Sequence, residues 1–314
     1  MATTPTGTPS PEYVLGHDRA ELARLEQQAA VLAPHSRVIL ERAGLRPGMR
    51  VLDVGSGVGD VAFLAADLVG PEGSVVGLDR SETALARARE RADERGLTNL
   101  DFRSGELQGW RSDEVFDVVI GRLILLYVDD PVVTVRSVAD LVRPDGVVAF
   151  MEYDMAAVRS IPALPLVERV RGWVLDGFTK SGNDPELGVR LAAILSEAGL
   201  RDVGAVGLQT FLPPGSPVGP AMAAGVIRSL LPALEAHGIA TAAEVDIDTL
   251  EVRLRDELAG DGTVFAPPAL IGAWGTTESE ATAWISASTC SDDVAMLGPN
   301  RRYDSRYGVT LATI

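Results

Sequence analysis

Residues 51–60 read Val-Leu-Asp-Val-Gly-Ser-Gly-Val-Gly-Asp. A short apolar run ends at Asp53 and leads directly into three glycines at alternate positions, Gly55, Gly57 and Gly59. Residues 61–68 then have the apolar pattern of a helix. Glycine is needed where backbone approaches a ligand, because a Cβ would hold the ligand away and such turns often require φ > 0. The order of strand, glycine turn and helix therefore predicts a small-molecule site at the end of a strand.

The acidic residues around this turn narrow the class of ligand. Asp79 lies 24 residues after Gly55, a distance that suits contacts to two ribose hydroxyls. A dinucleotide fingerprint would require a small residue where Asp60 stands, and a carboxylate there would repel a pyrophosphate. Asp53 instead suits an ammonium group. These residues favour a nucleoside that carries an amino-acid moiety; a structural turn that binds no ligand is the alternative.

The composition limits the function classes. The 314 residues are 46% apolar and 23% charged, which is ordinary for a globular protein, and the formal charge of −16 disfavours nucleic acid as a partner. The single cysteine, Cys290, excludes an internal disulfide framework and a cysteine-rich metal site, and no metal is expected. The chain shows no secretory signal pattern and no long uncharged apolar run, so we expect a cytoplasmic protein without a membrane span.

Strand and helix patterns alternate through the first half of the chain. We expect strands over residues 51–54, 74–79, 100–103, 116–121 and 147–153, with helices over 61–68, 81–96 and 130–142. This alternation predicts an α/β protein with a doubly wound parallel sheet. Two helices are expected ahead of the sheet, one from Asp18 and one from Pro34 to Gly44.

The pattern changes after Asp154. We expect helices over residues 165–178, 184–199, 219–236 and 242–258, and strands over 202–212 and 263–274. Pro267 and Pro268 interrupt the last strand, which places it at a sheet edge or a bulge.

Several motifs in order carry a family resemblance. Residues 49–154 resemble the S-adenosylmethionine (SAM) binding core of class I SAM-dependent methyltransferases of the UbiE-like, small-molecule type. The matching segments are residues 51–59, 77–81, 104–107, 116–119 and 141–147. Two positions depart from the family pattern: Glu106 replaces an aspartate and Asp145 replaces a glycine.

The resemblance implies a Rossmann-like methyltransferase fold with a mostly parallel seven-stranded sheet, an N-terminal helical lid and helical cap insertions. The implied organisation is a disordered stretch over residues 1–12, the lid over 13–45, the SAM-binding core over 46–155, the rest of the sheet with the cap over 156–277, and a C-terminal extension over 278–314. That extension is interpreted as a dimer arm, a tail or a lid, and a homodimer is one expected partner.

The resemblance also implies which residues bind SAM and its product, S-adenosylhomocysteine (SAH). The turn and Asp53 would hold the methionine end, Asp79 the ribose, and Glu106 the adenine amine. Arg122 would reach the carboxylate of SAM, or would instead pair with Asp129 or Asp130. The full predicted cofactor set is Tyr13, Gln28, Asp53, Gly55, Ser56, Gly57, Asp79, Arg80, Gly105, Glu106, Leu107 and Arg122.

The acceptor side of the reaction is less determined. No catalytic residue is assigned, and His17, Tyr153 and His237 are weak candidates for a proton acceptor. The predicted acceptor contacts are Glu152, Tyr153, Trp173, Phe178 and Met222, which could equally pack the cap against the core.

The predicted function is methyl transfer from SAM to a small organic metabolite of secondary metabolism. Oxygen is expected first as the methylated atom, with nitrogen or carbon as alternatives. A SAM-binding protein that is regulatory or catalyses another reaction is the second hypothesis. An NAD-dependent oxidoreductase is the third, and the carboxylate of Asp60 argues against it.

Overall fold

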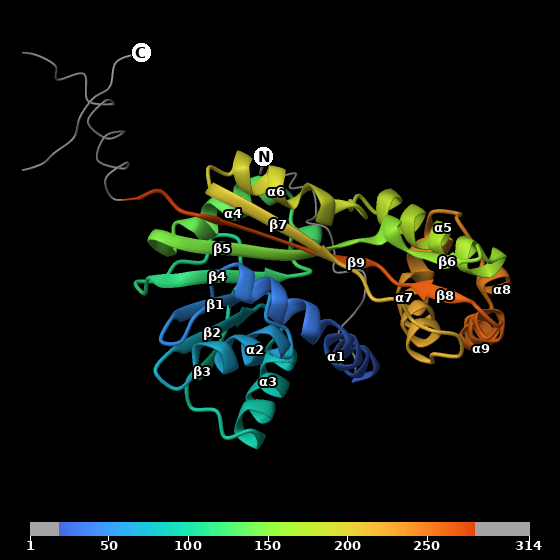
Figure 1. Ribbon diagram of the computed structural model, residues 1–314, viewed down its shortest axis with the longest axis horizontal. Coiled ribbons are helices and arrows are strands. Elements are labelled where there is room, and N and C mark those ends of the chain that lie inside the picture. The colour runs from blue at the N-terminus through green and yellow to red at the C-terminus, as the bar shows by residue number, and fades with distance from the viewer. Residues whose placement is uncertain (1–18, 280–314) are drawn as a thin grey trace, which may run out of the picture. The chain divides into compact units, whose positions relative to one another are not determined.

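The computed structural model describes residues 19–279, and most of them form an α/β unit built on a seven-stranded sheet (Figure 1). The strand order is β3-β2-β1-β4-β5-β9-β7. The strands are β1 (Arg50–Val54), β2 (Ser74–Asp79), β3 (Leu100–Ser104), β4 (Phe116–Arg122), β5 (Val142–Asp154), β7 (Arg201–Leu208) and β9 (Ala269–Thr276). Strands β1 to β5 are parallel, and β9 runs antiparallel to β5 and β7. The predicted doubly wound, mostly parallel sheet is confirmed.

Helices pack against both faces of this sheet. Helices α1 (Arg19–Arg42), α2 (Asp60–Val69) and α3 (Glu82–Glu94) contact one another or the sheet on one face. Helices α4 (Pro131–Ala139) and α6 (Leu187–Glu197) pack together on the other (Figure 1). Local sequence sets where they begin: the Ser81 hydroxyl accepts from Ala84 N at 3.3 Å, and Asp130 Oδ1 accepts from Val133 N at 3.0 Å.

A second group of elements forms a cap beyond the end of β5. It consists of α5 (Pro165–Lys180), α7 (Val218–Ala236), α8 (Ala242–Val245), α9 (Ile247–Leu258) and an antiparallel pair, β6 (Arg159–Ile161) with β8 (Val264–Ala266). Two short 3₁₀ turns, η1 (Leu125–Tyr127) and η2 (Met155–Ala157), follow β4 and β5. Figure 1 shows α5, α7, α8 and α9 gathered at one end of the sheet. No described helix is both long and apolar enough to cross a bilayer.

Two predicted helix boundaries were wrong. The two helices expected before the sheet are one helix, α1, with Pro34 inside it. The proline removes one backbone hydrogen bond, but Ile39 and Leu40 are fully buried and anchor the following turns. The helix expected over residues 242–258 breaks at Asp246, whose φ is 43°.

The last predicted strand divides into two strands in different sheets. Pro267 and Pro268 separate β8 from β9, and β9 begins at Ala269. Because no proline lies within β9, the strand can hydrogen-bond on both sides and lies between β5 and β7, away from any edge.

The compact unit that contains the sheet and the cap ends at Thr277, and a second unit begins at Glu278. Of that second unit the structure describes Glu278 and Ser279. The predicted segment 1–12 and the predicted extension 278–314 beyond Ser279 lie outside the described residues, as do Tyr13, His17 and Cys290.

Candidate functional site

The strand register brings the predicted site residues to one edge of the sheet. Val54 pairs with Leu78 on β2 and with Gly121 on β4. The residues that follow on each strand, Gly55, Asp79 and Arg122, therefore lie side by side where the parallel strands end. Ligands of doubly wound sheets bind at this carboxyl edge.

The glycine turn has the backbone conformation that only glycine adopts easily. The φ angles of Gly55, Gly57 and Gly59 are 68°, 53° and 88°. A Cβ on Gly55 would lie 2.8 Å from the Ile124 side chain, whereas a Cβ on Gly57 would meet nothing within 4 Å. Gly55 therefore packs against the protein, and Gly57 presents bare backbone to open space.

Asp79 connects the turn to the end of β2. One carboxylate oxygen, Oδ2, accepts from Gly57 N at 2.8 Å, and the other, Oδ1, accepts from Ser81 N at 2.8 Å. An ionised carboxylate has about four lone-pair sites, so each oxygen keeps capacity for a further donor. Asp79 is thus held rigidly beside the open face of Gly57, in a position that suits a ligand with paired hydroxyls.

Asp53 is a buried carboxylate with an incomplete set of partners. Its side chain is 1% exposed, and Oδ2 has no hydrogen-bond partner among the described residues. Burial raises the pKa of Asp53 to about 8, although the charge of Arg122 opposes that rise. The Ser56 hydroxyl in the same turn is also buried without a partner. Orphaned buried polar atoms are costly, and a bound cationic donor would satisfy them.

Arg122 faces helix α1 and the buried acids rather than the helix α4 cap. Its Nη1 donates to the Ser36 hydroxyl at 3.2 Å, and Asp130 is occupied by its capping bond to Val133 N. The guanidinium interacts electrostatically with Asp60, Tyr153 and Asp53. The predicted alternative of an ion pair with Asp129 or Asp130 is not found among the described residues, and Arg122 contributes a positive charge at the site.

Asp60 has a different role from the one that the sequence indicates. It pairs with Arg91 at 2.7 Å, and Arg91 also donates to Val58 O at 2.6 Å. The pair is close to neutral, so Asp60 does not act as a bare repulsive charge. It ties the start of α2 to α3 instead.

The predicted adenine contacts follow β3. Glu106 is exposed, as is Arg80 after β2, and Leu107 is half-buried. Gly105 N donates to Asp79 O at 3.0 Å, and a Cβ on Gly105 would lie 2.9 Å from Trp110. Trp110 is not among the predicted site residues. Its position soon after the segment 104–107 was nevertheless a signal, because an aromatic ring can stack on a planar group such as adenine.

Glu152 does not face an acceptor, contrary to the prediction. It is 1% exposed, and its Oε1 accepts from Ile124 N at 2.8 Å and from Leu125 N at 2.7 Å. Burial raises the pKa of Glu152 to about 8 despite these bonds. The side chain therefore holds the turn after β4, whose Ile124 packs against Gly55.

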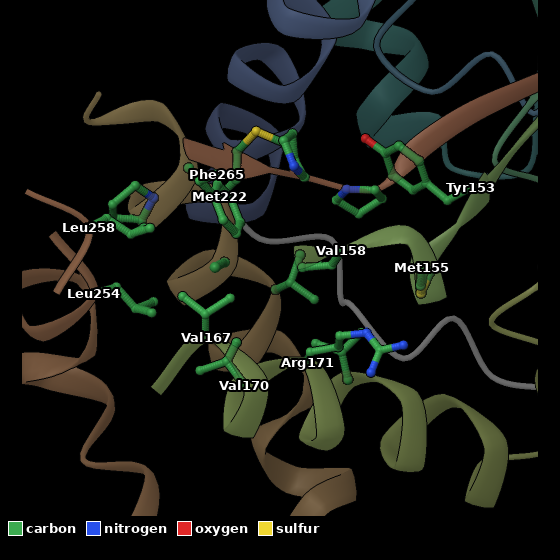
Figure 2. A pocket seen from close by; sticks show the side chains of 17 residues that line it. Tyr153, Met155, Val158, Val167, Val170, Arg171, Met222, Leu254, Leu258 and Phe265 are labelled. Atoms are coloured by element: carbon green, nitrogen blue, oxygen red, sulfur yellow. The ribbon is translucent and has the colours of Figure 1, made fainter. Parts of the chain in front are cut away.

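A largely apolar pocket, the cap pocket, lies between the end of β5 and the cap (Figure 2). It encloses about 680 Å³ of empty space, part of it open to solvent. Tyr153 and Met222, two of the predicted acceptor contacts, line it, whereas Trp173 and Phe178 are buried and not part of its lining. Helical spacing cannot distinguish a residue that faces the pocket from one turned into the core.

Two further candidates lie on helices or at a helix end. His237 is exposed at the end of α7. Gln28 lies in α1. Among the described residues, no cluster of three or more histidine, cysteine, aspartate or glutamate side chains could hold a metal ion.

Comparisons with known proteins agree with this architecture. Residues 45–173 match the family described as a methyltransferase domain. The chain is 40% identical over 119 residues to nocamycin O-methyltransferase of Saccharothrix syringae, a match that covers 36% of this chain and 41% of that protein. It is 32% identical over 136 residues to the ubiquinone/menaquinone biosynthesis C-methyltransferase UbiE of Ectopseudomonas mendocina, covering 43% and 51%. The matched segment spans about half or less of these relatives.

A solved structure supports the fold. An N-methyltransferase of Haemonchus contortus, in complex with phosphomonomethylethanolamine and S-adenosylhomocysteine, aligns with a TM-score of 0.52 at 17% identity. The alignment covers 87% of this chain and 61% of that one. Residues 45–173 thus resemble a methyltransferase domain, and the described sheet has the fold of the solved N-methyltransferase.

Proposed function

We propose that this protein is a SAM-dependent methyltransferase that acts on a small organic molecule. The proposal is carried by the open backbone of Gly57, which is bonded to Asp79, together with the orphaned carboxylate oxygen of Asp53 at the end of the preceding strand. Similarity of the core to the nocamycin O-methyltransferase and to UbiE supports the same activity.

The residues present fit the chemical groups of SAM. The buried Asp53, with an unpartnered oxygen, suits the ammonium of the methionine end, and Arg122 suits its carboxylate. Asp79 suits the ribose hydroxyls because both of its oxygens are pre-oriented by backbone donors. When bound, SAM would supply an electrophilic methyl group to a lone pair of the acceptor, with SAH as the leaving group.

The chain's contribution to catalysis would be alignment and exclusion of water. Displacement needs nucleophile, methyl carbon and sulfur nearly in line at about 3–3.5 Å. We place Tyr153 nearest the reacting atoms, because it ends β5 and lines the cap pocket. Oxygen is the first choice of methylated atom, which the O-methyltransferase relative supports. A role in secondary metabolism and assembly as a homodimer belong to this proposal as well.

Calorimetry on the full chain tests the proposal. SAM and SAH should bind, and Asp79→Ala should weaken SAH binding by about 1–3 kcal/mol through lost charge-assisted hydrogen bonds. Asp67→Ala, an exposed aspartate on α2, is the matched control and should leave the affinity unchanged. Folded protein that binds neither ligand, or that binds NADH instead, would overturn the assignment.

A further inference from the structure

The lining of the cap pocket is almost entirely apolar. Its walls come from η2 and the residue after it, from α5, from α7, from α9 and from the β8 region, so segments far apart in the sequence meet there. The lining residues are Tyr153, Met155, Val158, Val167, Val170, Arg171, Val174, Gly219, Pro220, Met222, Ala223, Val226, Leu254, Leu258, Phe265, Pro267 and Pro268. Figure 2 shows the apolar side chains of Val158, Val167, Val170 and Met222 around a common space.

The one charged residue in this lining already has partners. Arg171 donates to Ala156 O from Nε at 3.2 Å and from Nη2 at 3.0 Å, and its Nη1 lies 3.9 Å from Glu168 Oε2. The aliphatic part of Arg171 thus lines the pocket, while the guanidinium is bound to backbone and to an acid. A charged group among these apolar side chains would lose its hydration, and the single lining charge, Arg171, is already engaged by Ala156 O and Glu168, so a charged ligand is disfavoured.

Tyr153 links the pocket to the site around the glycine turn. It lies at the end of β5, and it lines the pocket at one end (Figure 2). Arg122, on the neighbouring strand β4, pairs with Met151 of β5, so Tyr153 lies two residues beyond Arg122's partner at the same edge of the sheet. A molecule in the pocket would therefore have one end near the residues assigned to the methionine part of SAM.

We propose that this pocket binds the methyl acceptor, and that the acceptor is a neutral, mainly hydrocarbon molecule with its polar group beside Tyr153. The inference rests on the proposed function and names its substrate class. The pocket holds about 680 Å³ of empty space, part of it open to solvent, and nearly all of its lining is apolar.

A fluorescence titration of the full chain tests the pocket's preference. N-phenyl-1-naphthylamine, a neutral apolar probe, should bind with enhanced emission. Neutral 2-naphthol should displace it at a concentration about tenfold or more below that required of 6-hydroxynaphthalene-2-sulfonate, because the sulfonate would be buried unpaired. Absence of probe binding, or displacement by the sulfonate at an equal or lower concentration, overturns the inference.

A matched pair of variants locates the probe. Val226 lines the pocket from α7, whereas Val252 on α9 is 51% exposed. Val226→Asp should weaken probe binding about tenfold or more by placing a carboxylate in the apolar wall. Val252→Asp should change it by less than about twofold, as surface substitutions do. Equal effects of the two substitutions would show that the probe binds elsewhere.

SAH calorimetry on the same proteins separates the two proposals. Both variants should bind SAH like the original chain, which also shows that they are folded. If Val226→Asp does not fold, Ala223→Trp, which fills the pocket from a half-buried position on α7, takes its place. SAH binding with no neutral-ligand preference defeats the substrate class alone, whereas probe binding without SAH binding defeats the methyltransferase function.

Discussion

Single residues of the site combine burial with incomplete hydrogen bonding. Asp53 illustrates this, because it is 1% exposed, has an unpartnered Oδ2, and has a pKa raised to about 8 by burial. Its ordinary value of 3.8 applies in the unfolded chain. The folded state therefore holds a proton that the unfolded state releases, and the free energy of unfolding falls as pH rises between these two values. A ligand ammonium beside Asp53 would favour the ionised form.

The protonation of Asp53 gives the first prediction. At about pH 6.5 the carboxyl is mostly protonated, so binding of SAH should release up to about one proton as the ammonium lowers the pKa. Calorimetry in buffers of different ionisation enthalpy measures that release. The affinity should also rise with pH between about 6 and 7.5, by up to about tenfold per unit.

Asp53→Asn is the control for this prediction. It keeps the size of the side chain but cannot ionise, so SAH should bind more weakly, without proton release and with a flatter pH profile. Equal proton release by the variant and the original chain would mean that another group titrates and that Asp53 does not face the ammonium.

In the turn between β1 and α2, two glycines are required for different reasons: Gly55 for packing inside the protein and Gly57 for access to a ligand. Gly55 is required because Ile124 packs where its Cβ would be, and Glu152 holds Ile124 in place. Gly57 has no such neighbour within 4 Å. Gly57 is needed for its positive φ and because its backbone must stay exposed to a ligand.

Substitution of Gly57 by alanine is the prediction at this scale. Gly57→Ala should cost about 1–2 kcal/mol of stability for its left-handed backbone and should weaken SAH binding about tenfold or more, because the methyl group enters the open face. Gly48→Ala is the control, since Gly48 also has a positive φ and an unobstructed Cβ direction but lies in the turn before β1. It should show the same loss in urea unfolding with normal SAH affinity. Normal SAH affinity in both variants would remove Gly57 from the binding site.

The whole molecule depends on contacts that join distant segments of the cap. Glu257 on α9 accepts from Leu166 N at 3.1 Å and from Val167 N at 3.2 Å, and so caps the first turn of α5 about 90 residues earlier. Gln209 likewise donates to Ala157 O at 3.0 Å and to Pro267 O at 2.8 Å. These bonds position Val167 and Pro267, which line the pocket.

Loss of the Glu257 cap should therefore destabilise the chain. Glu257→Ala is expected to lower the free energy of unfolding by about 0.5–2 kcal/mol, measured by urea denaturation. Glu251→Ala is the control on the same helix, because Glu251 pairs at the surface with Arg255 and should cost at most about 0.5 kcal/mol. Equal losses in the two variants would show that the cap bond contributes nothing beyond an ordinary surface pair.

The cofactor side of the site could be predicted from the sequence because its signals are local. Asp53, Gly55 and Gly57 occur within five consecutive residues, and Asp79 ends the next strand. Strand, turn and helix formation depend on neighbouring residues, and parallel pairing then brings the strand ends together. The first five strands and their parallel arrangement follow from the same alternation, whereas their order in the sheet comes from the structure.

The acceptor side depended on tertiary structure. Glu152 and Tyr153 are neighbours at the end of β5, yet the first holds a backbone turn and the second lines the pocket. Trp173 and Phe178 share α5 with Val170 and Val174, but they are buried outside the lining. Local patterns predict that a helix or strand forms, whereas the packing of distant segments decides which of its side chains faces a cavity.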